Sequence, residues 1–267
     1  MACEEIALRL QNFWKDEGCP SIPPYGAIPA LWLTPDAFFG ILAARPWRSC
    51  QRVSVFDLLQ APYGDDPLRP VVDSRLQVTQ QGFSGDPREE FIESLQSLGL
   101  DLCARDLRFV PSECEQPYLA VRGARWRVLI DGIDVGSISY LHRLAGFDLK
   151  EVAMAAEYSL CRLAICLEGQ DKDGSKELGR QIASYALEAS EPETINSLLR
   201  PYTDECERAL ESGLYFPAYE HVLTLAYWNQ LAGLREPVTF VERSEQAEQI
   251  ASLAHGCASV YMEAANV

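Results

Sequence analysis

Three arginines stand close together where a predicted strand of the chain begins. Arg122, Arg125 and Arg127 occur in a protein whose formal net charge is −16, with 23 Lys and Arg against 39 Asp and Glu. Residues two apart on a strand project from the same face, so Arg125 and Arg127 share one face and Trp126 lies on the other. Guanidinium groups that lie close together repel one another unless a nearby anion neutralises their charge. Two interpretations follow: a bound carboxylate or phosphate held by forked hydrogen bonds, or an internal Asp or Glu in a salt-bridged strand face.

Other kinds of catalytic or metal site find little support in the sequence. The three histidines are far apart, and a lone histidine such as His142 is more often a structural or surface residue than a general base. The nine cysteines are irregularly spaced and no pair has the gap of a zinc knuckle, so we expect buried free thiols and no metal site. No nucleophile elbow, Walker-type loop or dinucleotide fingerprint is present.

The composition narrows the class of protein further. The 267 residues are 48% hydrophobic and 23% charged, as in an ordinary soluble globule. The acidic balance argues against broad binding of nucleic acid and against docking on anionic membranes. The start of the chain has no basic region followed by an apolar core, and the longest apolar runs are too short to span a membrane. We therefore expect a cytoplasmic protein.

The positions of apolar, turn-forming and capping residues predict two domains. An antiparallel α+β domain is expected over residues 1–171, and a helical C-terminal domain over 172–267, after a polar linker. The Asp131-Gly132 pair is a strong hairpin signal between two strands. The first domain is expected to hold helices at 3–17, 35–44, 87–98 and 158–168. Its strands are expected at 52–58, 71–80, 107–110, 126–130 and 133–141, with a further β-like run that leads from residue 151 into the last helix. The second is expected to hold helices at 178–189, 192–212, 217–232 and 242–265.

The order of several short motifs resembles a known family. Residues 10–19 (Leu-Gln-Asn-Phe-Trp-Lys-Asp-Glu-Gly-Cys), 63–69 (Tyr-Gly-Asp-Asp-Pro-Leu-Arg), 158–164 (Tyr-Ser-Leu-Cys-Arg-Leu-Ala) and 217–220 (Pro-Ala-Tyr-Glu) occur in this order along the chain. A strand–loop–strand unit, followed by a strand that leads into an apolar helix with an arginine near its start, resembles class II aminoacyl-tRNA synthetases. The motifs together resemble the α subunit of the bacterial tetrameric glycyl-tRNA synthetase over nearly the whole chain.

This resemblance implies nucleotide-binding positions, one of which is altered. Arg162 matches the arginine of motif 3, which faces ATP, and Arg69 is a second arginine near the nucleotide. The same register places Asp57 where the family carries the motif 2 arginine that holds the α-phosphate. Replacing that arginine by an aspartate removes one transition-state donor, typically worth about 3–4 kcal/mol, and adds like-charge repulsion. Arg48, Arg52 or Arg69 takes over this role if the register is shifted by a few residues.

The resemblance also places the family's amino-acid pocket at the arginine cluster. Arg127 stands in place of a family glutamate, which reverses the charge that would face the ammonium group of glycine. Ser137 and His142 stand in place of family glutamines. The ligand pocket implied in this way consists of Arg122, Arg125, Arg127, Ser137 and His142.

These departures predict a paralogue of the glycyl-tRNA synthetase α subunit that has lost glycine activation. Such a pseudoenzyme acts by binding an anionic small ligand or a protein partner. One alternative is a ligase that activates a different carboxylic or amino acid as an adenylate, with ATP as the cosubstrate; another is a divergent glycyl-tRNA synthetase α subunit. We also expect a homodimer, because Phe13 and Trp14 of the opening helix lie on a stripe that a lone domain would leave uncovered.

Overall fold

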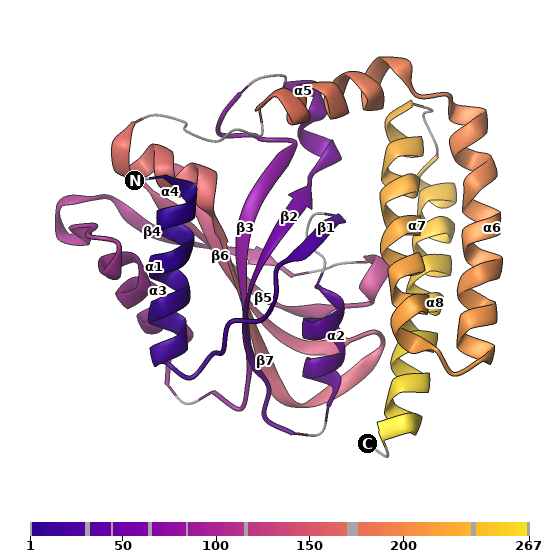
Figure 1. Ribbon diagram of the computed structural model, residues 1–267, viewed down its shortest axis with the longest axis horizontal. Coiled ribbons are helices and arrows are strands. Elements are labelled where there is room, and N and C mark those ends of the chain that lie inside the picture. Colours follow the sequence, from indigo (N-terminus) through magenta and orange to yellow (C-terminus); the bar gives the residue numbers. More distant parts are fainter. Residues whose placement is uncertain are drawn as a thin grey trace.

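A seven-stranded sheet forms the centre of the protein (Figure 1). The computed structural model describes residues 2–29, 33–43, 45–63, 66–83, 85–114, 117–169, 176–235 and 239–265. The strands are β1 (Tyr25–Pro29), β2 (Arg48–Phe56), β3 (Val72–Gln81), β4 (Leu107–Glu113), β5 (Arg122–Ile130), β6 (Ile133–Leu144) and β7 (Phe147–Ser159). Their order is β1-β2-β3-β7-β6-β5-β4, and each neighbouring pair is antiparallel except β1 and β2. The antiparallel sheet confirms the predicted fold class; the parallel strand β1 was not among the predicted strands.

The hairpin between β5 and β6 turns at Asp131 and Gly132, as predicted. Their φ angles of 50° and 83° are both left-handed, which is the requirement of the tight turn that suits a twisted hairpin. The Asp131 carboxylate accepts hydrogen bonds from Arg105 Nη1 at 2.7 Å and from the Asp106 backbone N–H at 2.9 Å. This turn sets the register that places Arg127 opposite Ser137 on the neighbouring strand.

Helices cover both faces of the sheet (Figure 1). Helices α1, α3 and α4 pack on one face, where Leu76 and Ile138 lie, and α2, α7 and α8 pack on the other, where Val53 and Ala153 lie. The sheet is therefore the middle of three layers. The helices are α1 (Cys3–Asp16), α2 (Pro35–Leu42), α3 (Pro87–Ser97), α4 (Leu160–Glu168), α5 (Lys176–Ser184), α6 (Pro192–Glu211), α7 (Tyr215–Arg235) and α8 (Phe240–Ala265).

The C-terminal helices share a hydrophobic core with the sheet. Cys206 of α6, Tyr219 of α7 and Leu253 of α8 belong to the same buried cluster as Val53 of β2. An uninterrupted helix was predicted at 178–189, but α5 is followed by a single π-helical turn at Tyr185–Ala189. The predicted boundary between residues 171 and 172 lies outside the described residues and stays a prediction.

The opening helix is covered by the chain itself. Trp14 is completely buried, and its indole Nε1–H donates a hydrogen bond to the Tyr158 hydroxyl at 3.2 Å. Ile6 and Leu10 are also completely buried, and Phe13 is half-buried. The expectation that this stripe stays uncovered in a lone domain is therefore wrong, so the stripe gives no support to a homodimer.

Two further features of the fold are the hydropathy of its helices and the state of its cysteines. No helix among the described residues is long and apolar enough to cross a membrane. None of the nine cysteines forms a disulfide, but the expectation of buried thiols is wrong for Cys103, which is exposed, and for Cys3 and Cys114, which are half-buried. Burial raises the pKa of Cys19 and of Cys50 to about 12. These two thiols therefore stay protonated at neutral pH and pack as small apolar groups.

Candidate functional site

One half of a sheet face is lined by polar side chains. Alternate residues of a strand point to the same face, and the register places Gln77, Glu157, Ser137 and Arg127 in one row across four strands. We call these residues and their polar neighbours on the same face the polar strip. Its members are Gln51, Asp73, Arg75, Gln77, Arg125, Arg127, Ser137, Glu157 and Ser159.

Arg75 lies at the centre of the negative end of the polar strip. Its side chain is 10% exposed; Nε donates to Asp73 Oδ2 at 2.8 Å, and Nη1 donates to Glu157 Oε2 at 3.1 Å. Burial alone would lower the pKa of Arg75, but the charges of Asp73 and Glu157 outweigh it and raise that pKa above its usual value. Arg75 is therefore a permanent cation, held by two carboxylates.

The carboxylates that hold Arg75 have further donors. Ser159 Oγ donates to Asp73 Oδ1 at 2.8 Å, and Gln77 Nε2 donates to Glu157 Oε1 at 3.2 Å. Asp57 lies close enough to Arg75 to raise its pKa further. Two carboxylates thus contact the guanidinium of Arg75 and a third, that of Asp57, acts on it without a hydrogen bond, so this end of the polar strip carries net negative charge.

The opposite end of the polar strip is positive. Arg125 Nη2 donates to Ser137 Oγ at 2.9 Å, and Arg127 Nε donates to Asp134 Oδ2 at 2.8 Å. Arg162, in the first turn of α4, donates from Nη1 to the Asp134 carbonyl at 3.1 Å. The Nε atoms of Arg125 and Arg162 are buried and find no acceptor among the described residues. Each guanidinium therefore keeps a donor for a further anionic group.

The structure brings together only part of the predicted ligand pocket. Arg125, Arg127 and Ser137 meet in the polar strip, whereas Arg122 is exposed at the start of β5. His142 is exposed beside the bulge of β6, five residues along the strand from Ser137, a distance of about 17 Å. Neither Arg122 nor His142 is part of the polar strip.

Arg127 forms a salt bridge within the chain, which is the second of the two interpretations of the arginine cluster. Its partner Asp134 is an internal carboxylate, so Arg127 needs no external anion. The Arg127 side chain is 47% exposed, and ion pairs of this kind contribute little to stability. Arg125, rather than Arg127, is therefore the arginine of β5 that keeps a buried Nε donor without an acceptor among the described residues.

Asp57 and Arg69 lie at the two ends of the segment between β2 and β3. The Asp57 backbone N–H donates to the Val71 carbonyl at 2.9 Å, and its carboxylate accepts from Gln60 Nε2 at 3.2 Å. Arg69 is half-exposed and its guanidinium lies over the Tyr63 ring, 4.0 Å from the centroid. The structure therefore places Asp57, but not Arg69, near the buried charges. Residues 64 and 65 of this loop lie outside the described residues.

The sequence interpretation missed the residues at the negative end of the polar strip. Asp73, Arg75 and Gln77 alternate with apolar Leu76 and Val78 in one strand. Glu157 likewise interrupts a buried apolar stretch of β7. Charged residues on the inward positions of a strand are almost never buried unless paired, so the alternation itself signalled a buried ion pair.

The polar strip carries both signs of charge, and the residues that the structure describes hold no metal centre. No group of three or more His, Cys, Asp and Glu within them is arranged to hold a metal ion. At the positive end, the free donors of Arg125 and Arg162 suit a carboxylate or a phosphate. At the negative end, Ser159, Gln77 and Arg75 already use carboxylate oxygens of Asp73 and Glu157.

Comparisons with known proteins point to one family over the whole chain. The sequence profile described as "Glycyl-tRNA synthetase alpha subunit" matches residues 3–266. The glycine–tRNA ligase α subunit of Rickettsia bellii (strain OSU 85-389) is 28% identical over an alignment of 282 residues, gaps included, which covers 98% of each chain. That of Petrotoga mobilis is 28% identical over an alignment of 280 residues, which covers 100% of this chain and 98% of the relative. Among solved structures, a pyrrolysyl-tRNA synthetase from Desulfitobacterium hafniense has a TM-score of 0.42 at 12% identity, covering 63% of this chain and 67% of that one.

Proposed function

This chain belongs to the glycyl-tRNA synthetase α-subunit family, and we propose that it is a member that does not activate glycine. Its polar strip instead binds an anionic small ligand. The observation that carries the proposal is that Asp73 and Glu157 both bind the guanidinium of Arg75, close enough to Asp57 for its charge to raise the pKa of Arg75. In the family register, Asp57 takes the place of the arginine that holds the α-phosphate of ATP.

An ATP phosphate fits poorly beside these three carboxylates. The charge of Asp57 acts on Arg75, but the Nε and Nη1 donors of Arg75 are already used by Asp73 and Glu157. A phosphate placed there meets net negative charge, and like charges at close range raise the energy of the complex. The motif 3 arginine, Arg162, is kept, but Arg162 by itself does not supply the α-phosphate contact.

The positive end of the polar strip supports binding of an anion. Arg125 and Arg162 each keep a buried Nε donor without an acceptor among the described residues, which is costly unless a ligand supplies one. Because these donors are buried, a carboxylate or phosphate on a small molecule reaches them more readily than a side chain on a protein surface. The proposal therefore favours a small ligand over a protein partner.

Pyrophosphate exchange with ATP tests the loss of glycine activation. We expect no glycine-dependent exchange, and we expect Asp57→Arg to leave the protein inactive, because Asp73 and Glu157 still face the site. Glycine-dependent exchange in the unmodified protein contradicts the proposal. Exchange that depends on another carboxylic or amino acid identifies the repurposed ligase instead.

Thermal-shift measurements with carboxylates and phosphates test the ligand site. A ligand present at 100 times its Kd stabilises the native state by about 2.7 kcal/mol. We expect Arg125→Gln to lose this stabilisation and Arg122→Gln, a change at an exposed arginine of the same strand, to keep it. Equal responses of the two variants place the anion outside the polar strip.

Assembly and location come to this chain from its family as part of the same proposal. We propose a homodimer in the cytoplasm, although the opening helix does not require a partner. Light scattering at micromolar concentration checks the assembly: a mass of about twice the 29.8 kDa of one chain is expected.

A further inference from the structure

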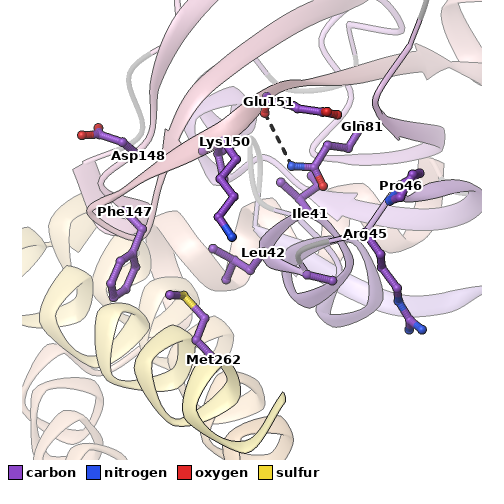
Figure 2. Close-up of a pocket in the computed structure, with 12 residues that line it drawn as sticks. Ile41, Leu42, Arg45, Pro46, Gln81, Phe147, Asp148, Lys150, Glu151 and Met262 are labelled. Carbon is purple, nitrogen blue, oxygen red and sulfur yellow. Dashed lines mark hydrogen bonds between the residues drawn. The ribbon is translucent and has the colours of Figure 1, made fainter. Parts of the chain in front are cut away.

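A cleft of about 340 Å³ opens at the other end of the sheet face that carries the polar strip (Figure 2). Gln81 lies on the same face of β3 as Arg75, six residues and about 20 Å further along the strand. The cleft lies between the end of α2, the start of β7 and the C-terminal part of α8. A cavity of this size accommodates a small organic molecule. It is separate from the site of the proposed function.

Apolar side chains form most of the wall of the cleft. Figure 2 shows Phe147 and Met262 next to each other on the α8 side, with Leu42 and Ile41 of α2 across from them. Phe147 is held in place by stacking on His255, with ring centroids 4.5 Å apart. These side chains provide a preformed surface for an apolar group.

Lys150 places a positive charge over this apolar surface. Figure 2 shows its side chain extending toward Leu42. Lys150 is exposed and makes no ion pair with any residue that the structure describes. The neighbouring Asp148 is engaged by Arg143, whose Nε donates to Asp148 Oδ1 at 3.0 Å. In a chain of net charge −16, an unpaired cation beside an apolar cleft is suited to a carboxylate.

Gln81 contributes a buried acceptor without a donor. The residue is 6% exposed, and its Nε2 donates to the Glu151 carbonyl at 3.5 Å. Its Oε1 is buried and finds no donor among the described residues. Figure 2 shows this oxygen turned away from Glu151, toward Ile41. A buried acceptor left without a partner destabilises a protein, so an N–H group of a ligand in the cleft would satisfy it.

We propose that this cleft binds an apolar amino acid whose nitrogen is acylated and whose carboxylate is free. The apolar side chain lies against Leu42, Phe147 and Met262, and the carboxylate pairs with Lys150. The amide N–H donates to Gln81 Oε1. This chemistry belongs both to a free N-acylated amino acid and to the C-terminal residue of a peptide.

Isothermal titration of the full chain with N-acetyl-leucine tests the proposal. We expect N-acetyl-leucinamide, which lacks the carboxylate, to bind at least tenfold more weakly, and Lys150→Met to remove that difference. Lys15→Met, at an exposed lysine of α1, serves as the matched control and keeps the difference. Equal binding of acid and amide to the unmodified protein, or no binding of either, overturns the proposal.

A second pair of probes tests the role of Gln81. The N-methylated form of N-acetyl-leucine has no amide hydrogen, so we expect the unmodified protein to bind it about tenfold more weakly. Gln81→Met removes the acceptor and is expected to bind both forms equally. A preference for the N–H form that survives Gln81→Met contradicts the proposed contact.

A short peptide that ends in leucine distinguishes the two sources of the ligand. Tighter binding of Ala-Ala-Ala-Leu than of N-acetyl-leucine assigns the cleft to peptide termini, and the reverse order assigns it to free acylamino acids. Arg125→Gln does not alter these affinities, because Arg125 belongs to the polar strip. Failure of this proposal and failure of the proposed function are therefore seen in different variants.

Discussion

The two ends of one sheet face differ in how they are stabilised. At the polar end, Arg75 is held by Asp73 and Glu157. At the other end, the same face is covered by α2, α7 and α8, and Phe38 stacks on Tyr219 with ring centroids 4.2 Å apart. The apolar end gains stability from burial itself, whereas the polar end loses stability unless every buried charge has an oppositely charged partner. A sheet face is thus divided into a part that anchors helices and a part that is available for a site.

The largest effect is expected from breaking the buried ion pairs of the polar strip. Arg75→Met leaves Asp73 and Glu157 buried without their cation, and such a change typically destabilises a protein by about 3–5 kcal/mol. Arg127→Met is the matched control, because it breaks a half-exposed pair worth about 0–1 kcal/mol. Urea unfolding of both variants measures the free energies.

A double variant separates charge from packing at this site. The double variant Arg75→Met/Glu157→Gln removes one of the carboxylates that Arg75→Met leaves without a cation. The double variant is therefore expected to regain part of the stability that Arg75→Met loses. If the double variant is no more stable than Arg75→Met, packing rather than charge determines the cost. In that case, the contrast between the two ends of the sheet face disappears.

The second prediction concerns the packing of the apolar end. A Cβ added at Gly40 of α2 would lie 2.2 Å from Trp47, so Gly40→Ala forces a rearrangement that typically costs about 1–3 kcal/mol. Trp47 has little freedom to move, because its Nε1–H donates to Thr79 Oγ1 at 2.9 Å.

Gly233 of α7 is the matched control for Gly40. Nothing lies within 4 Å of a Cβ added there, so Gly233→Ala is expected to stabilise the helix by about 0.5–1 kcal/mol. The midpoint temperature of thermal unfolding should fall for Gly40→Ala and rise for Gly233→Ala. The same sign for both variants would mean that close packing is not what distinguishes α2.

The sequence allowed the elements to be predicted better than the site. Local signals were sufficient for the Asp131-Gly132 hairpin and for α3, whose cap Asp86 accepts from the Arg88 backbone N–H at 3.0 Å. Long-range contacts were not accessible in this way. Nothing in the local sequence around Trp14 indicates that Tyr158 covers it, and the pairing of Arg75 with Glu157 depends on the register of β3 against β7.

The smallest effect is expected at an ion pair outside the polar strip, that of Asp86 and Arg88. Hydrogen bonds from the Arg88 side chain and backbone lower the pKa of Asp86 below its usual value. A carboxyl whose folded-state pKa is depressed contributes stability above its unfolded pKa, near pH 4, and this contribution is lost as the pH falls through the folded-state pKa. Asp86→Asn keeps a good cap but removes the charge.

The pair is partly exposed, with side-chain exposures of 34% for Asp86 and 41% for Arg88, so solvent screening keeps its contribution to stability small. We expect Asp86→Asn to be slightly less stable than the unmodified protein at neutral pH and equally stable well below pH 4. Urea unfolding across this range measures the difference. A difference that persists at low pH would mean that the amide disturbs the cap itself. A difference as large as that of Arg75→Met would show that burial is not what makes the charges of the polar strip costly to unpair.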